Sequence, residues 1–386
     1  MKAILFLGKA LVALVIAVCL AATLIPPFLD RIYYEGPASA HFDGSRFFNP
    51  DGDGAGQIPI KGNRANFVVR WLTGSDDREV WPDRIEVKPL RSFPPLAEGE
   101  MRATWVGHAT VLIEMPGLTV LTDPIWSDRS GPFGIGPKRV AEPGIRFEDL
   151  PKVDLVVVSH NHYDHMDLAT IQALWERDKP VIVTALGNEA LIRRTGAKVI
   201  ALDWGQHLSI RPSIDVAVTR NHHWSSRWFV DRNRALWSSF VVTHPAGNVF
   251  FAGDTGYGDG KWAEEARALG PVRLALIPIG AFRFEPGQME TGSHIGPIKA
   301  ERIFAGLGAS FAIPIHWGTF QLSSEARETP PKMLGEVMKC AGYRDIGVFS
   351  AKQIGAPVMV PPLAETAIPP APDPRCLTGD AITRLK

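Results

Sequence analysis

The stretch VDLVVVSHNHYDHMD, residues 153–167, joins an apolar run to a cluster of imidazoles and carboxylates. Residues 153–159 are mostly apolar and rich in β-branched side chains, which is typical of a strand buried on both faces of a sheet. A tight loop after such a strand can direct alternate side chains into one cleft. We therefore expect the polar residues after residue 159 to form a site at the end of a buried strand.

The polar part of this stretch has the spacing H-x-H-x-D-H, formed by His160, His162, Asp164 and His165. His160 and His162 can point the same way and bind one ion. Asp164 and His165 can turn back towards a second ion about 3.5–4 Å away, the usual separation in two-metal hydrolytic sites. Three imidazoles and a carboxylate packed together are costly to desolvate unless a cation compensates. The motif therefore predicts a metal site.

Further candidate ligands lie just beyond other predicted strands. They are His222 and His223 after 214–219, Asp254 after 248–252, and His316 after 311–315. Gly253 and Gly256 flank Asp254 and permit a close backbone approach. The carboxylate of Asp254 can bridge two cations with one oxygen on each, which an imidazole cannot do. We therefore expect Asp254 to be shared between two ions.

Two residues near this set have competing interpretations. Asp123 ends the predicted strand 118–122, and we expect it to accept a ring N–H from a ligand histidine and fix its tautomer. The alternative for Asp123 is a turn aspartate before Pro124. His108, in the sequence GHAT, is expected to have a turn or core role rather than a role in the site.

Composition limits the class of protein. The 386 residues are 45% hydrophobic, which is enough for a globular core, and 41 basic residues balance 41 acidic ones. No basic excess points to nucleic acid. Cys19, Cys340 and Cys376 are too few and too widely spaced for a thiolate metal site. A site of histidine and carboxylate suits zinc, manganese or iron. The sequence leaves open whether Cys340 and Cys376 pair or remain free thiols.

The N-terminal segment is strongly apolar. Residues 10–29 follow Lys2 and Lys9 and are interrupted by Pro26 and Pro27. Counted from residue 4, the stretch reaches about 25 residues, near the length that spans a bilayer. The lysines favour an orientation with the N-terminus inside. We expect an anchor in a bacterial inner membrane with the catalytic domain in the periplasm. A cleaved signal peptide with a secreted or periplasmic product is the alternative.

Strands and helices alternate irregularly from residue 101 onwards, which predicts an α/β fold with mixed sheets. The chain divides into four expected regions. They are a hydrophobic anchor or signal segment (1–30), an irregular connector that packs on the body (31–95), a hydrolase domain (96–362) and a loosely attached, Pro-containing C-terminal tail (363–386).

The motifs taken together resemble a known superfamily. TDP (122–124), SHNHYDH (159–165), His223, GDTG (253–256) and IHWGT (315–319) resemble the motif series of the metallo-β-lactamases. PKR (137–139), NHHW (221–224), IPIGAF (277–282) and IHWGTF (315–320) resemble the phospholipase D subgroup that hydrolyses N-acylphosphatidylethanolamine. The resemblance covers roughly residues 104–331. It implies a four-layer αββα sandwich with two zinc ions at one edge, with manganese or iron as alternatives.

The resemblance assigns the ligands residue by residue. It implies a first zinc on His160, His162 and His223, a second zinc on Asp164, His165 and His316, and Asp254 between them. His223 is chosen over His222 because the ligand histidine of the family directly precedes a tryptophan, here Trp224. The family also has a site histidine in an H-x-x-P segment, matched here by His294 and Pro297, although Ile298 and Lys299 replace its acidic residues.

The expected activity is hydrolysis of a phosphodiester in a membrane lipid, with release of an N-acylethanolamine and phosphatidic acid. His294 and Asp164 are the expected catalytic residues, with His294 orienting the phosphate or assisting proton transfer. The expected partners are the phospholipid substrate and the bilayer, with a homodimer as an option. Residues 282–289 are expected to form either an apolar lip or an ordinary surface loop. The alternatives are a lactonase or small-molecule phosphodiesterase and, less favoured, a non-catalytic zinc-binding membrane module.

Overall fold

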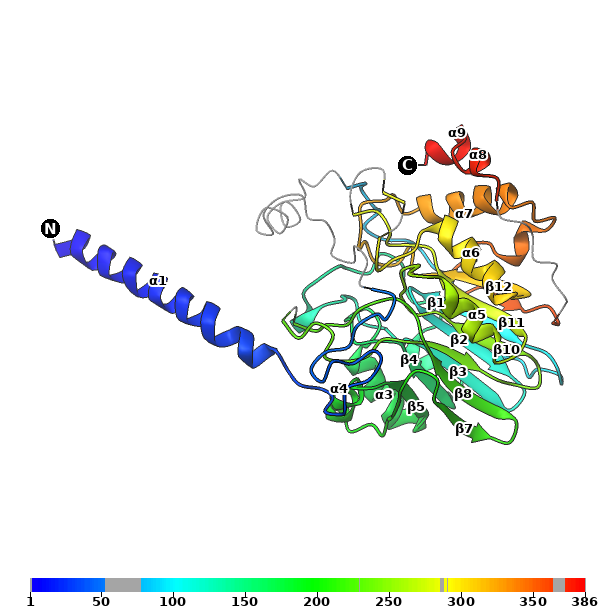
Figure 1. The fold of residues 1–386 in the computed structure, drawn as a ribbon, viewed down its shortest axis with the longest axis horizontal. Helices are drawn as coiled ribbons and strands as arrows, with labels where there is room; N and C mark the ends of the chain where they lie inside the picture. Colours follow the sequence, from blue (N-terminus) through cyan, green and yellow to red (C-terminus); the bar gives the residue numbers. More distant parts are fainter. Residues whose placement is uncertain are drawn as a thin grey trace.

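A computed structural model of the chain places two β-sheets face to face, with helices on their outer sides (Figure 1). The structure describes residues 2–52, 78–228, 230–284, 288–289, 291–363 and 372–385. The first sheet contains β1 (Arg102–Gly107), β2 (Thr110–Met115), β3 (Leu118–Thr122), β4 (Leu155–Val158), β5 (Val181–Ala185), β6 (Ile200–Leu202) and β13 (Pro357–Met359). The second contains β7 (His207–Arg211), β8 (Ile214–Thr219), β9 (Ser239–Val242), β10 (Asn248–Phe251), β11 (Val272–Pro278) and β12 (Phe311–Ile315). The helices are α1 (Lys2–Leu29), α3 (Leu168–Asp178), α4 (Glu189–Ile192), α5 (Lys261–Arg267), α6 (Pro297–Leu307), α7 (Thr329–Cys340), α8 (Pro374–Leu377) and α9 (Asp380–Thr383).

Strand β4 shows how the layers are held together. The first sheet has the order β13-β1-β2-β3-β4-β5-β6, so β4 is an interior strand. Leu155 and Val157 pack in the core between the two sheets, whereas Val156 and Val158 pack with apolar residues of α3 and α4 on the outer face. A strand covered on both faces is what the apolar run predicted.

The second sheet has the order β12-β11-β10-β9-β8-β7, and α5 and α6 cover its outer face. Trp262 of α5 is fully buried and stacks on Phe250 of β10, with ring centroids 6.3 Å apart. Strands β10, β11 and β12 are parallel. Their carboxyl ends therefore meet at one edge, and the loops that follow β10 and β12 bring Asp254 and His316 to that edge. The αββα sandwich expected from the sequence is confirmed.

Several elements differ from the sequence-based expectation. The sequence pattern of residues 103–114 predicts one strand paired with 118–122. The structure instead has two antiparallel strands there, β1 and β2, because the chain turns at His108, whose φ is 54°. Strands β7 and β13 and helix α7 were not predicted. The sequence of α7 begins TPPK, and two prolines in the first turn hide a helix from a search for apolar periodicity.

Helix α1 extends away from the sandwich (Figure 1). Its segment Gly8–Ile25 has a mean hydropathy of 2.4 and is not buried, so by length and composition it could cross a membrane. The helix continues to Leu29 rather than ending before the two prolines. Of the expected connector, residues 31–52 and 78–95 contain only isolated bridges, and residues 53–77 lie outside the described part.

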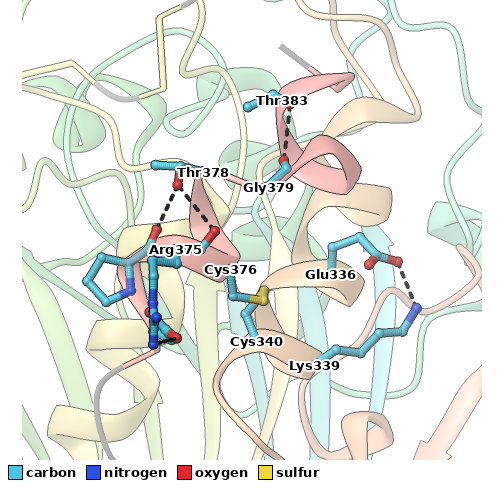
Figure 2. Close-up of a disulfide and its surroundings, with 10 residues drawn as sticks. Glu336, Lys339, Cys340, Arg375, Cys376, Thr378, Gly379 and Thr383 are labelled. Atoms are coloured by element: carbon cyan, nitrogen blue, oxygen red, sulfur yellow. Dashed lines mark hydrogen bonds and ion pairs between the residues drawn. A yellow bond between two sulfur atoms is a disulfide. The ribbon is translucent and has the colours of Figure 1, made fainter.

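The C-terminal tail is attached rather than loose. A disulfide joins Cys340, at the end of α7, to Cys376 of α8 (Figure 2). Ile382 of α9 is buried against Met333 and Val337 of α7. The pairing that the sequence left open is therefore present, and it holds the two short C-terminal helices on α7.

Candidate metal centre

The loop after β4 carries the first set of candidate ligands. His160 Nε2 lies 2.7 Å from His162 Nδ1, which in turn lies 3.4 Å from Nε2 of His223 in the loop after β8. Asp254 Oδ2, after β10, is 3.9 Å from His223 Nε2. One ligand atom from each of these four residues lies within 4.8 Å of the others. We call His160, His162, His223 and Asp254 the first cluster.

A second cluster adjoins the first. It consists of His108, Asp164, His165 and His316, again with ligand atoms within 4.8 Å of one another. Asp164 Oδ2 lies 2.8 Å from His108 Nε2, 3.3 Å from His165 Nε2 and 3.4 Å from His316 Nε2. Asp254 Oδ2 lies 3.1 Å from His165 Nε2 and 3.0 Å from His316 Nε2. Asp254 therefore faces both clusters.

The outer ring nitrogen of several histidines is held by a fixed partner. The pairs are His165 Nδ1 with Asp123 Oδ2 at 2.6 Å, His223 Nδ1 with the Ser293 carbonyl at 2.8 Å, and His316 Nδ1 with the Gly280 carbonyl at 2.9 Å. A ring N–H donated outward leaves Nε2 as a lone pair that faces the site. The contact from Asp123 is the one that the sequence suggested, and Ser159 fixes that carboxylate through its hydroxyl and its backbone N–H.

Some buried polar atoms of the site have no hydrogen-bond partner within the described part of the chain. They include Nε2 of His162, Nε2 of His165 and Oδ1 of Asp254. Buried lone pairs left in this way are unfavourable unless a cation satisfies them. Imidazole nitrogens and carboxylate oxygens without a thiolate suit zinc, manganese or iron. The residues present therefore fit a metal centre with room for two ions.

Burial controls the protonation of the first cluster. It lowers the pKa of His160 and of His223 well below the usual value, and it lowers the pKa of His162 to about 3. Neighbouring histidines lower the pKa of His160 further. These three rings are therefore neutral at pH 7, the form in which imidazole binds a metal.

In the second cluster, burial lowers the pKa of His108 to about 3, but carboxylates reverse this effect for the other two histidines. Burial lowers the pKa of His165 and His316, but the charges of Asp254 and Asp164 outweigh it. As a result, the pKa of His165 is raised well above its usual value and that of His316 is raised to about 9. Burial also raises the pKa of both carboxyl groups, but the histidines lower it well below 3.8. Without ions, protons on the second cluster compensate its carboxylates.

Three residues at the second cluster have a strained backbone conformation. His108, Asp123 and His316 have φ values of 54°, 30° and 62°, in the left-handed region that side chains other than glycine rarely adopt. Such a conformation costs about 1–3 kcal/mol per residue and persists where the surroundings enforce it. His108 and His316 belong to the second cluster, and Asp123 contacts the ring of its His165.

The comparison with known families decides the identity of this site. A model of the Beta-lactamase superfamily domain matches residues 119–317. This chain belongs to that family. The matched region includes Asp123, the loop after β4, His223, Asp254 and His316, so the family and the geometry describe the same centre. We conclude that the chain is a metal-dependent hydrolase of the metallo-β-lactamase superfamily.

Curated relatives agree with this family. The chain is 32% identical over 274 residues to N-acyl-phosphatidylethanolamine-hydrolyzing phospholipase D 1 of Caenorhabditis elegans, covering 68% of this chain and 76% of the relative. It is 32% identical to the mitochondrial enzyme of that name from Saccharomyces cerevisiae, covering 63% and 53%. A metal-dependent hydrolase of Methanopyrus kandleri is 30% identical over 57% of this chain and 85% of its own.

Solved structures agree in fold. The metallo hydrolase Igni18 of Ignicoccus hospitalis superposes with a TM-score of 0.51 and 20% identity, covering 67% of this chain and 98% of its own. A metal-dependent hydrolase from Veillonella parvula superposes with a TM-score of 0.53 and 16% identity over the same shares. At these identities the likeness extends to the sandwich alone.

The position of His108 corrects the role expected for it. It is buried, as a core residue would be, but its Nε2 contacts Asp164 and its ring centroid lies 4.1 Å from that of His316. The metal-dependent hydrolase therefore places a third imidazole at the second cluster, beside those of His165 and His316. The available signal was a histidine directly after Gly107, within the segment 103–114 that was predicted as one strand. A glycine there permits a turn, which can bring the histidine to the sheet edge.

His294 and His222 take different positions. His294 Nδ1 lies 3.8 Å from Asp254 Oδ2, and its side chain is 15% exposed, so it borders the centre from the open side. Burial lowers its pKa to about 4, so the ring is neutral at pH 7. His222 turns away and lies 3.0 Å from the carboxylate of Asp51. The structure thus brings His223, and not His222, to the ligands.

A cavity of about 530 Å³ opens beside the ligand loop of the hydrolase. Its lining combines polar, charged and apolar residues: Ser127, Asp128, Arg129, Gly131, Gly134, Tyr163, Met166, Asp167, Leu168, Ala169 and Arg227. Tyr163 lies between two ligands, and Met166 follows a third. Phe133 and Ile135, which flank the lining residue Gly134 in the sequence, are 88% and 68% exposed. The segment 282–289 was expected to form an apolar lip or an ordinary surface loop. Its Phe282 is fully buried against α7, and residues 285–287 lie outside the described part of the chain.

Proposed function

We propose that the chain is a dinuclear zinc phosphodiesterase of the phospholipase D type that acts on N-acylphosphatidylethanolamine-like lipids. The observation that carries the proposal is the shared carboxylate of Asp254 between two clusters, together with 32% identity to two relatives that bear this activity in their names. Two ions about 3.5–4 Å apart are the arrangement used for in-line displacement at phosphorus.

The proposed reaction is hydrolysis of one phosphodiester bond. The oxygen of a water molecule bonds to phosphorus, and the bond to the ethanolamine oxygen breaks, which gives phosphatidic acid and an N-acylethanolamine. Bound ions would supply activation of that water and neutralise charge that develops on the phosphoryl oxygens. His294 borders the centre as a neutral ring, so it is placed to donate a hydrogen bond to the phosphate. It could also accept the proton released by the attacking water and pass it to the leaving oxygen.

Three features support action at a membrane. Helix α1 is long and apolar enough to cross a bilayer. Phe133 and Ile135, which flank the cavity-lining residue Gly134 in the sequence, expose apolar surface. The Cys340–Cys376 disulfide fits an oxidising compartment such as the periplasm. We therefore propose that α1 holds the hydrolase domain at the outer face of a bacterial inner membrane, where phospholipid is available.

A lipid-panel assay tests this proposal. The full chain in detergent or proteoliposomes, loaded with zinc, is incubated with N-acylphosphatidylethanolamine, phosphatidylethanolamine and phosphatidylcholine, and the products are identified by mass spectrometry. We expect N-acylethanolamine and phosphatidic acid from the first lipid alone. Inactivity on that lipid with activity on bis(p-nitrophenyl) phosphate or on lactones would contradict the lipid substrate.

A small polar substrate is the second candidate. It is favoured by the charged lining of the cavity, to which two arginines (Arg129 and Arg227) and two aspartates (Asp128 and Asp167) contribute. A lactonase or small-molecule phosphodiesterase would use this lining to orient its substrate. Competition decides between the two: glycerol phosphates should inhibit a small-molecule enzyme at low concentration and leave hydrolysis of vesicle-bound lipid largely unchanged.

A further inference from the structure

The segment directly after α1 runs along the loops that carry the metal ligands. We call residues 30–52 the N-terminal strap. Phe42 and Phe47 bury their rings in the main core, and the backbone N–H of Phe47 donates to the Asn233 carbonyl at 2.8 Å. The strap therefore packs on the 221–234 loop, which carries His223, over much of its length.

Asn49 joins the strap to a ligand. Its Nδ2 donates to the backbone carbonyl of His223 at 2.9 Å, and its Oδ1 accepts from Trp237 Nε1 at 3.1 Å. Asn49 is 6% exposed, so these bonds lie away from solvent and are costly to lose. Since the Ser293 carbonyl holds the ring of His223, Asn49 holds its backbone, and the two contacts together fix the direction of Nε2.

Asp51 extends the same support to a second loop. Its carboxylate accepts from the backbone N–H of Asp259 at 2.8 Å and lies 3.0 Å from His222 Nδ1. The loop of Asp259 begins at Asp254, the carboxylate shared by both clusters. One short piece of the strap, residues 49–51, therefore contacts the loop of His223 and the loop of Asp254.

Tyr33 reaches the remaining ligand loop indirectly. Its hydroxyl donates to Asp231 Oδ2 at 2.8 Å, and Asp231 Oδ1 accepts from the backbone N–H groups of Arg227 and Trp228. Arg227 Nη1 donates to the carbonyls of Asn161, between His160 and His162, and of Met166, directly after His165. Its guanidinium also lies 3.5 Å above the ring centroid of Tyr163.

We propose that the N-terminal strap positions the metal centre, with Asn49 as the main positioning residue and Tyr33 as the second. Neither residue touches substrate or ions. Both act through the loops that carry His223, Asp254 and the ligands after β4. The inference rests on the proposed two-ion centre and not on the lipid substrate. The N-terminal strap would therefore have a role in metal binding, in addition to joining the apolar helix to the hydrolase domain.

Ion affinity of the full-length chain tests the role of Asn49. In Asn49→Leu the branched shape of the side chain is kept and these two hydrogen bonds are lost. We expect the ion of the first cluster, zinc or cobalt, to dissociate about 10–100-fold more readily, as measured by competition with a chelator. The visible absorption spectrum of the cobalt-loaded protein should also change, because the angle of His223 to the ion changes.

Phe47→Leu is the matched control. It removes packing from the same strap without removing a contact to a ligand loop, so it should lower the unfolding temperature and leave both ion affinities and the cobalt spectrum unchanged. Tyr33→Phe loses one hydroxyl and should weaken ion binding by about threefold to tenfold, since its effect passes through Asp231 and Arg227.

The outcomes separate the proposals. Unchanged ion affinity in Asn49→Leu, or an equal loss in Phe47→Leu, overturns the positioning role and leaves the strap as ordinary packing. A wild-type chain that fails to bind two ions contradicts the proposed function instead. A wild-type chain that binds two ions but does not cleave the lipid leaves the strap experiment valid.

Discussion

The two clusters share Asp254 but differ in charge and in support. The first cluster has three histidines that burial keeps neutral, and its His223 is held by the strap. The second has its own carboxylate, Asp164, and two histidines whose pKa values are raised. The first can therefore accept an ion without releasing protons, whereas the second must release them. On the proposed two-ion centre, one fold would therefore prepare two adjacent ion sites in opposite ways.

Removal of the shared carboxylate should abolish both sites together. In Asp254→Ala we expect hydrolysis of bis(p-nitrophenyl) phosphate to fall by roughly a thousandfold, or about 4 kcal/mol of barrier, because both ions lose a ligand. Glu265→Ala, on α5 and paired with Arg220, is the control and should stay near wild type. Metal analysis that still finds both ions in Asp254→Ala would show that the clusters are independent.

Single-ligand variants should separate the clusters. His162→Ala should lose the ion of the first cluster, and His316→Ala that of the second, so that each retains about one ion per chain with activity reduced on the order of a hundredfold. Inductively coupled plasma mass spectrometry after dialysis gives the metal content. Loss of both ions in both variants would mean that the centre fills only as a pair.

His108 should matter to the second cluster alone. In His108→Ala the Asp164 carboxylate loses a 2.8 Å contact, and we expect about 10–100-fold weaker binding of one ion with the other unchanged. His244→Ala, a histidine remote from both clusters, is the comparison and should bind both ions normally. The measurement is the two-step release of cobalt to a chelator.

The metal-free protein should respond to pH through the second cluster. His316 has a pKa of about 9 in the folded chain against about 6.5 when unfolded, so its stabilising contribution is complete below pH 6.5 and is lost as the pH rises towards 9. We expect the unfolding temperature of the metal-free protein to fall over this window. The zinc-loaded protein should show little change, because ions replace the protons. Equal profiles for both forms would contradict the assigned charge state.

The smallest effect on the centre is expected from the disulfide. Reduction of Cys340–Cys376 should lower the free energy of unfolding by about 2–4 kcal/mol and leave the metal content of both clusters unchanged. The bond lies on α7 and α8, and both cysteines are outside the clusters (Figure 2). Denaturant unfolding with and without reductant, alongside metal analysis, measures both quantities.

The ligand positions could be predicted because each follows a recognisable strand. His160, Asp254 and His316 come after β4, β10 and β12, and parallel strands bring such loops to one edge. The pattern also allowed Asp123 to be placed beside a ligand histidine. These predictions rest on residues that are neighbours in the sequence. In each case a short apolar run is followed directly by histidine or aspartate, whose side chains can bind a metal ion.

The rest depends on contacts between distant residues. His108 is a single histidine whose turn and contact to Asp164 arise only when β1 and β2 pair and β12 lies beside them. Asn49 is 174 residues away from His223 and sits in an irregular segment with no periodicity to indicate a role. Helix α7 was hidden by its prolines. Such features follow from packing, which a pattern in the sequence does not encode.

Gly258 lies against Asp51 of the N-terminal strap and leaves no room for a larger residue. Its φ is 54°, and a Cβ at this position would lie 2.3 Å from Asp51 Oδ2 and 2.5 Å from His222 Nδ1. A larger residue at position 258 would therefore push Asp51 away from the loop of Asp254. We expect positions 51 and 258 to change together among related sequences. A relative that lacks the glycine at position 258 should also lack the aspartate at position 51. The N-terminal strap and the loop after β10 would then evolve together, although they are far apart in the sequence.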